Sequence, residues 1–204
     1  MTSAYSTFAN KGMRVSPMML MRIEDKNGTV LQNFVPETKE VLSEESAYVI
    51  LNLMEGVTQG GSGTRLRTTW PRPKYITGYP YQFENAIAGK TGTTQNQSDG
   101  WFMGMVPNLT TGVWTGGVDR SVHFEEIYKG QGASMSLPTW ALFMKKCYAD
   151  KTLNISKKPF DEPEELSIEL DCDKVPESTG TEDSEGKTNN ENKSDDDSDG
   201  FDDA

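Results

Sequence analysis

The chain has 204 residues and a formal net charge of −11, which is unevenly distributed along its length. Residues 1–160 hold 13 acidic and 17 basic side chains, whereas residues 161–204 hold 18 acidic and 3 basic ones. The acidic C-terminal part excludes nucleic acid as its partner, because the phosphate backbone carries charge of the same sign. No run approaches the ~20 apolar residues of a membrane-spanning helix, and the N-terminus does not resemble a signal peptide.

The first predicted element is a β-hairpin over residues 13–35. Its strands run from Met13 to Asp25 and from Thr29 to Val35, and the turn lies at Lys26-Asn27-Gly28. Asn-Gly between two apolar-rich runs is the strongest short-range hairpin signal.

Two helices are predicted, over residues 42–58 and 134–150. The first has Ser43 and Glu44 at its start, where a capping hydroxyl and acidic side chains are favourable. Both carry apolar residues at helical spacing. In the first helix these are Ala47, Ile50, Leu51 and Met54, and in the second Trp140, Phe143, Met144, Cys147 and Tyr148.

Between these helices, residues 85–119 predict three strands joined by short connections, hence an antiparallel meander. The strands are Asn85 to Thr94, Asp99 to Val106 and Thr111 to Asp119. Glycines in all three indicate close backbone approach or tightly packed helices. The aromatic side chains of this region and of the second helix are interpreted as core, with carbohydrate stacking as the alternative. They are Trp101, Phe102, Trp114 and Trp140. The resulting fold class is α+β.

A basic and aromatic stretch precedes the meander, and it is interpreted as a solvated loop. Contact with an anionic glycan or a peptide is the alternative. Its members are Arg65, Arg67, Arg72, Lys74, Tyr75, Tyr79 and Tyr81.

The C-terminal part is predicted as an extension over residues 161–174 and a disordered acidic tail over residues 175–204. The tail has almost no apolar residues, so it cannot offset the entropy of its chain. Its run Asp195–Asp199 is interpreted as solvated charge rather than a calcium loop, because it lacks the full EF-hand pattern.

Cysteine and histidine suggest no chemistry of their own. Cys147 and Cys172 fit no metal spacing; burial of Cys147 is favoured, and a disulfide between the two is the alternative. His123, which lies between the last strand and the second helix, is assigned to a loop or to packing. No metal or cofactor is expected.

The segment richest in chemistry is Lys90-Thr91-Gly92-Thr93-Thr94, which follows the mostly small and apolar run Glu84–Gly89. Glycines let a second backbone come close, hydroxyls and an ammonium can hold a carboxylate, and strand N–H groups can face a developing oxyanion. Lys-Thr-Gly belongs to the motif set of class A β-lactamases and penicillin-binding proteins. A match to a three-residue motif is weak by itself, and an ordinary edge-strand turn without a binding role is the alternative.

The neighbourhood strengthens this match. The runs Gly89–Thr94, Asp99–Phe102 and Trp114–Gly116 closely resemble the transpeptidase domain of a bifunctional, class A penicillin-binding protein. Ala4–Gly12 looks like the helix end and glycine cap that precede a hairpin in this family, and Lys129–Lys146 resembles the loop and closing helix of the domain. The resemblance covers about residues 4–158, so residues 1–160 are expected to form the C-terminal part of such a domain.

The resemblance implies roles for five residues. Lys90 places positive charge beside the nucleophile and assists proton transfer, and Thr91 and Thr93 hold the terminal carboxylate of the peptide. The backbone N–H of Thr93 is one oxyanion donor, which with Lys90 makes these two the implied catalytic residues. Gly92 leaves room for substrate along the strand. Thr94 completes the implied substrate-binding segment.

Two motifs that the family needs are not found on the globular part. No Ser-x-Asn occurs, and the sole Ser-x-x-Lys is Ser184–Lys187 in the acidic tail, where no scaffold would fix its geometry. We therefore expect the C-terminal part of a larger enzyme, cut after these motifs and inactive in isolation. In the family two further strands lie next to Thr111–Asp119, so this glycine-rich edge is an aggregation hazard.

The implied function is the substrate-binding half of a D-alanyl-D-alanine serine transpeptidase, which is the target of penicillin. Expected partners are peptidoglycan stem peptides, β-lactams and the N-terminal part of the same enzyme, with membrane contact only through an anchor in that part. The implied location is the extracytoplasmic face of the cell membrane (periplasm). The alternatives are a nonenzymatic carboxylate- or peptide-binding module, and a fragment of a D,D-carboxypeptidase or serine β-lactamase.

Overall fold

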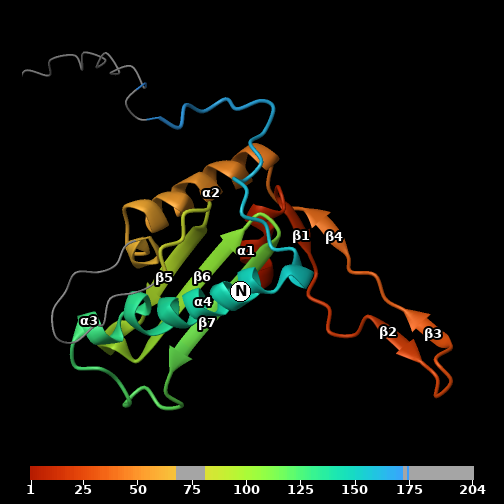
Figure 1. The fold of residues 1–204 in the computed structure, drawn as a ribbon, viewed down its shortest axis with the longest axis horizontal. Helices are drawn as coiled ribbons and strands as arrows, with labels where there is room; N and C mark the ends of the chain where they lie inside the picture. The colour runs from red at the N-terminus through yellow and green to blue at the C-terminus, as the bar shows by residue number, and fades with distance from the viewer. Residues whose placement is uncertain (68–80, 172–173, 175–204) are drawn as a thin grey trace, which may run out of the picture. The chain divides into compact units, whose positions relative to one another are not determined.

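The computed structural model describes residues 1–67, 81–171 and 174 (Figure 1). The chain divides into two units, Met1–Leu170 and Asp171–Ala204. In the second unit, the described residues Asp171 and Lys174 form an ion pair at 3.2 Å. Cys172 and the predicted disordered tail lie outside the described residues, as does most of the basic stretch between residues 68 and 80. No helix in the described part of the chain is long and apolar enough to cross a bilayer.

The centre of the first unit is an antiparallel sheet of three strands in the order β5-β6-β7 (Figure 1). These are β5 (Ala88–Thr93), β6 (Asp99–Val106) and β7 (Leu109–Gly116). Thr91 is paired with Phe102, and Phe102 in turn with Val113. The meander predicted from the short connections is thus present, and the mixed helix-and-sheet class agrees with the α+β prediction.

Helices cover both faces of this sheet. Phe102 of β6 packs on Trp140 of α4 (Gly132–Ala149), with ring centroids 5.2 Å apart. The next side chains along β6 face the other way, because successive residues of a strand alternate. Met105 accordingly packs with Leu51 of α2 (Glu44–Gln59) and with Phe8 of α1 (Thr2–Ala9). The core is therefore divided between the α4 face and the α1–α2 face.

Glycines on β6 let α4 approach the sheet closely. A Cβ atom on Gly104 would lie 2.3 Å from the indole of Trp140, and one on Gly100 would lie 3.0 Å from the Cα atom of Gly132. The first distance is shorter than real Cβ contacts, and the second is tighter than most of them. The glycines that sequence analysis linked to tight helix packing have that role here.

The N-terminal hairpin is shorter than predicted. The strand β2 (Arg22–Glu24) pairs with β3 (Val30–Asn33) as expected around the turn, but a continuous strand from Met13 to Asp25 is wrong. β1 (Met13–Val15) instead pairs with β4 (Thr38–Glu40), beyond the predicted end of the hairpin. Pro17 and Pro36 lie between the two pairs, and proline cannot donate a ladder hydrogen bond.

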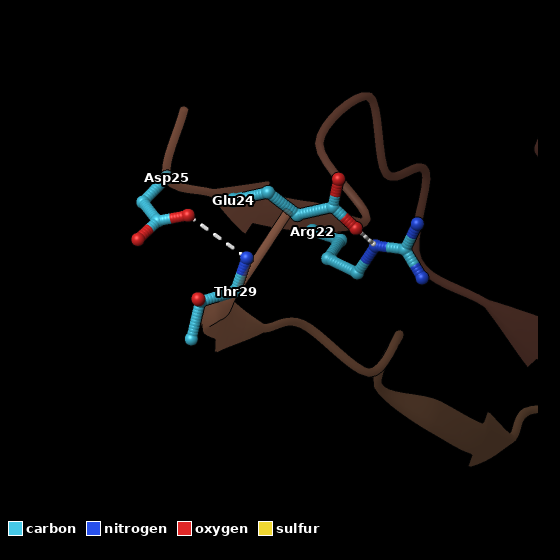
Figure 2. Close-up of polar contacts among 4 residues, drawn as sticks. All are labelled: Arg22, Glu24, Asp25 and Thr29. Carbon is cyan, nitrogen blue, oxygen red and sulfur yellow. Dashed lines mark hydrogen bonds and ion pairs between the residues drawn. The ribbon is translucent and has the colours of Figure 1, made fainter. Parts of the chain in front are cut away.

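The hairpin turn is organised by Asp25 (Figure 2). Its Oδ1 atom accepts hydrogen bonds from the amides of Asn27 and Thr29, both at 2.8 Å. These bonds favour the charged carboxylate and lower the pKa of Asp25. Gly28 has φ of 85°, the left-handed conformation that this turn requires. Arg22 and Glu24 form an ion pair at 2.5 Å on β2.

Several side chains differ from the predicted pattern. Phe143, which was assigned to the apolar face of the closing helix, is 47% exposed, whereas Trp140, Met144 and Cys147 are buried as expected. Trp114 was predicted as core but is 48% exposed. The helix α4 begins at Gly132, and the short helix α3 (Ile127–Gly130) occupies part of the predicted loop.

The C-terminal extension is attached to the first unit. Phe160 is buried against Leu51 and Met105, and the backbone amide and hydroxyl of Ser167 both donate to Glu45 at 2.6 and 2.5 Å. Residues 161–170 of the predicted extension thus lie in the unit that ends at Leu170.

Candidate functional site

The predicted site segment lies along β5, which is an edge strand of the sheet in the described part of the chain. The amide of Thr94 donates to the carbonyl of Asp99 at 3.1 Å, so Thr94 faces β6. Backbone groups of a strand point alternately to its two sides. The N–H and C=O groups of Thr93 and Thr91 therefore point away from β6, toward the open edge.

The side chains of the segment alternate between the two faces of the sheet. Thr91 is paired with Phe102, which faces α4, and so Thr91 and Thr93 both lie on the α4 face. Lys90 and Gly92 lie on the opposite face. The ammonium of Lys90 is exposed and donates to the carbonyl of Thr91 at 2.7 Å, which places a positive charge at the open edge.

Thr93 is joined to the start of α4. The amide of Gly132, the first residue of that helix, donates to the hydroxyl oxygen of Thr93 at 3.0 Å. The first amides of a helix have no partner within the helix, so this hydroxyl satisfies one of them. Because the oxygen of Thr93 accepts this bond, its own proton can be donated to another acceptor.

Thr91 has a hydroxyl neighbour from another segment. Ser62, in the exposed turn that follows α2, lies 2.7 Å from the Oγ1 atom of Thr91. The same turn is fixed to the end of α2 by the Gly63 amide, which donates to the carbonyl of Val57 at 2.9 Å. Ser62 thus adds a third hydroxyl to the α4 side of the β5 edge.

Gly92 and Thr94 have different surroundings from Thr91 and Thr93. A Cβ atom on Gly92 would lie 3.2 Å from the Cβ atom of Trp101, which is tight but not prohibitive. The hydroxyl of Thr94 is used in the turn between β5 and β6, where it accepts from the amide of Asp99 at 3.1 Å and lies 3.0 Å from the hydroxyl of Ser98. Thr94 therefore closes the turn.

Two arginines of the predicted solvated loop, Arg65 and Arg67, are instead packed into the fold. Arg65, in the short helix η1 (Thr64–Leu66), is 6% exposed and donates to the carbonyl of Ala133 and the hydroxyl of Ser134 at 3.1 and 2.6 Å. Its burial depends on contact with the start of α4. No local sequence pattern around residue 65 indicates this contact.

Arg67 holds the segment that leads into β5. Its guanidinium donates to the carbonyls of Phe83 and Asn85 at 3.0 and 2.5 Å and to the hydroxyl of Thr58 at 2.9 Å. Burial lowers the pKa of Arg67 and raises the pKa of Glu55, and the attraction between their charges opposes both shifts. Tyr81 is buried in the core beside Phe83, whereas the other members of the stretch, which lie between residues 68 and 80, are outside the described residues.

Sequence reasoning missed Ser62, Arg65 and Gly132 as neighbours of the site. The run Gly60-Gly61-Ser62-Gly63 and the glycine pair around Gln131 were the available signals, since glycine clusters indicate close backbone approach. A Cβ atom on Gly132 would lie 2.3 Å from the carbonyl oxygen of Gly92, which explains that glycine. His123 is exposed, and its Nδ1 atom lies 3.2 Å from the carbonyl of Phe124.

Comparison with known proteins gives consistent matches. The family model described as "Penicillin binding protein transpeptidase domain" matches residues 1–121. Penicillin-binding protein 1A of Aquifex aeolicus is 34% identical over 148 residues, which are 71% of this chain and 18% of that protein. Penicillin-binding protein 1A of Clostridium tetani is 30% identical over 159 residues, or 78% of this chain and 19% of that protein. The chain thus spans about a fifth of the length of these relatives.

Solved structures show the same fold. Penicillin-binding protein 1A of Haemophilus influenzae superposes with a TM-score of 0.61 at 22% identity, over 80% of this chain and 27% of that chain. PonA1 of Mycobacterium tuberculosis in complex with penicillin V gives a TM-score of 0.60 at 23% identity, over 81% of this chain and 40% of that chain.

Proposed function

Because this chain belongs to the penicillin-binding protein transpeptidase domain family, we propose that it supplies the substrate-binding part of a serine D,D-transpeptidase. Its substrate would be the D-alanyl-D-alanine end of a peptidoglycan stem peptide. The observation that carries this proposal is the open edge of β5, where two threonine hydroxyls, one lysine ammonium and outward-facing strand amides lie together.

The terminal carboxylate of the peptide is proposed to bind at Thr91 and Thr93. Both hydroxyls lie on one face of β5, and Thr93 retains its proton for donation because its oxygen already accepts from Gly132. Lys90 contributes positive charge at the same edge, which strengthens hydrogen bonds to an anion. Gly92, between the two threonines, leaves room for an extended substrate backbone.

The outward amide of Thr93 is proposed as one donor to the oxyanion. A transpeptidase acylates a serine: its hydroxyl oxygen bonds to the carbonyl carbon of the penultimate alanine, and the terminal alanine leaves with a proton. An acceptor amine then takes the acyl group and the serine regains its proton. A single oxyanion donor is worth about 3 kcal/mol in comparable sites.

The acylated serine is proposed to come from residues outside these 204. The family pattern of Ser-x-x-Lys occurs here just at Ser184–Lys187, outside the described residues, and Ser-x-Asn does not occur. The chain by itself should therefore bind a carboxylate ligand without being acylated. The rest of the enzyme, β-lactams, stem peptides and the extracytoplasmic face of the membrane complete the proposed setting.

The same observation favours a second candidate, a nonenzymatic module that binds peptide carboxylates. Such a module keeps the hydroxyls of β5 and has no use for a nucleophile. A D,D-carboxypeptidase or a serine β-lactamase would again need the serine from elsewhere.

The first test measures the size of the native protein in the source cells and whether that protein binds penicillin. Detergent-extracted membranes are labelled with fluorescent penicillin, and the same gel is probed with an antibody against the acidic tail. A single large band with both signals supports the transpeptidase. Tail signal confined to the mass of this chain, without penicillin, supports the binding module. A penicilloyl adduct on the isolated chain in an intact mass spectrum would refute the proposed source of the serine.

A further inference from the structure

Both threonine hydroxyls of the β5 edge are held by groups from outside the sheet. Ser62, in the turn after α2, lies 2.7 Å from the hydroxyl oxygen of Thr91. Gly132, at the start of α4, donates to that of Thr93 at 3.0 Å. The geometry of the two hydroxyls therefore depends on how the turn after α2 and the start of α4 are placed relative to each other.

Arg65 joins these two segments directly. It follows Ser62 in the same turn-and-helix segment, and its guanidinium donates to the carbonyl of Ala133 at 3.1 Å and to the hydroxyl of Ser134 at 2.6 Å. Both acceptors come immediately after Gly132. The hydroxyl of Ser134 accepts from Arg65 and in turn donates to the carbonyl of Tyr128 at 2.6 Å. We call these bonds from Arg65 to the start of α4 the Arg65 brace.

The Arg65 side chain is buried, which restricts the geometry of its hydrogen bonds. Arg65 is 6% exposed, and Gly132 and Ala133 are buried as well. Both bonds are donated by the Nη1 atom, whose N–H groups lie in the rigid guanidinium plane, so the two acceptors are held in defined directions. The contact of α4 with β5 adds to this precision, since Gly132 has no room for even a Cβ atom against the carbonyls of Gly92 and Trp101.

We infer that Arg65 is a positioning residue of the carboxylate site. It fixes the start of α4 against β5, so that the Gly132 amide stays on the oxygen of Thr93 and the hydroxyls of Thr91 and Thr93 keep their places at the β5 edge. The ligand class is a peptide or peptide mimic with a free terminal carboxylate. This inference rests on the proposed function, because the task that it assigns to Arg65 is to position the proposed carboxylate site.

The test uses the full 204-residue chain and two NMR measurements. The first, without ligand, is the exchange rate of the Gly132 amide with solvent. The second is the ratio of dissociation constants for N-acetyl-D-alanyl-D-alanine and its C-terminal amide, read from shifts of the Thr91 and Thr93 amides. Arg65→Lys keeps the charge but replaces the planar guanidinium with a shorter side chain that ends in a rotating ammonium. The matched control is Arg67→Lys, which changes a neighbouring arginine that binds Phe83, Asn85 and Thr58 instead of α4.

In Arg65→Lys we expect Gly132 to exchange about tenfold faster and the preference for the free carboxylate to fall about tenfold, the effect of one lost charge-assisted hydrogen bond. Ser134→Ala, which removes one acceptor of the brace, should shift both values in the same direction by less. Arg67→Lys should leave both at the wild-type value. Thermal unfolding of each variant establishes that it is folded.

Three outcomes overturn the inference: unchanged Gly132 exchange in Arg65→Lys, faster exchange with an unchanged carboxylate preference, or equal effects from Arg67→Lys. A merely structural arginine would weaken binding of both ligands equally and leave their ratio constant. If the wild-type chain shows no carboxylate preference, the proposed function fails first and Arg65 has no site to position. The exchange of Gly132 would still show whether the brace exists, so the two failures are separable.

Discussion

The amide of Gly132 donates a hydrogen bond to the hydroxyl of Thr93, so the first residue of α4 is joined to the last residue of β5. The bond satisfies a helix amide and orients a hydroxyl at the edge of the sheet at the same time. Stability and ligand binding are therefore coupled at Thr93, and a change there should affect both.

Replacing Thr93 with valine should destabilise the protein by about 1–3 kcal/mol, because the buried amide of Gly132 then lacks an acceptor. Valine has nearly the same shape as threonine, so packing changes little. Thr93→Ser keeps the oxygen and should retain most of the stability. Urea denaturation of the two variants and the wild type measures the difference. Equal stability of Thr93→Val and Thr93→Ser would show that the Gly132 amide is not dependent on Thr93.

Replacing Gly104 with alanine should cost about 1–3 kcal/mol, the usual range for overpacking a core. The added methyl would lie 2.3 Å from the indole of Trp140, which is fully buried between α4 and the sheet. Near-ultraviolet circular dichroism and urea denaturation would report the displaced indole.

The matched control for this variant is Gly56→Ala in α2. A Cβ atom there meets nothing within 4 Å, and alanine has a higher helix propensity than glycine. This change should raise stability by about 0.5–1 kcal/mol. Destabilisation of similar size by both variants would show that the effect at Gly104 is not a clash with Trp140.

Local patterns predicted local structure well. The turn at Lys26-Asn27-Gly28 is set by local backbone dihedral angles and by hydrogen bonds to a neighbouring side chain. Gly28 supplies the left-handed dihedral angle, and Asp25 supplies the hydrogen-bond acceptor. The three strands of the sheet are consecutive in the sequence, so short connections suffice to predict their pairing. The β1–β4 pairing was missed because the apolar runs do not show where Pro17 and Pro36 interrupt the ladder.

Contacts between distant segments could not be predicted from the same patterns. Arg65 bonds to a residue 68 positions later, so its burial is set by the placement of α4 and not by its basic neighbours. Trp114 has the alternation of a core residue, yet alternation gives the face of a strand and not whether another layer covers it. The Lys-Thr-Gly motif was found from the sequence, whereas the contacts of Ser62 and Gly132 with it could be seen only in the folded structure.

Replacing Thr58 with valine should destabilise the protein by about 1–3 kcal/mol, since Thr58 is fully buried between α2 and the approach to β5. Its hydroxyl donates to the carbonyl of Ile87 at 2.7 Å and accepts from Arg67 at 2.9 Å. Valine removes both hydrogen bonds and leaves the two partner groups unsatisfied, whereas Thr58→Ser keeps the hydroxyl. Thermal unfolding of the two variants provides the measurement, and equal melting temperatures would contradict the assigned role of the hydroxyl.

The attachment of the C-terminal extension should depend on pH through Glu45. Two hydrogen bonds from Ser167 favour the carboxylate and lower the pKa of Glu45 below its ordinary value. A carboxyl whose pKa is lowered by folding adds stability that is present above its unfolded pKa, about 4.3 for a glutamate, and is lost as the pH falls through the lowered value. Above pH 5 the attachment should therefore be constant.

The chemical shift of the Ser167 amide proton, followed from pH 7 to pH 2, measures this transition. We expect a single titration with its midpoint below the ordinary pKa of a glutamate, and an upfield shift as the bond to the carboxylate is lost. Glu45→Gln retains an acceptor oxygen but has no proton to gain, so its Ser167 signal should not titrate. A midpoint at or above the ordinary value in the wild type, or the same titration in Glu45→Gln, would mean that another group controls the attachment of the extension to α2.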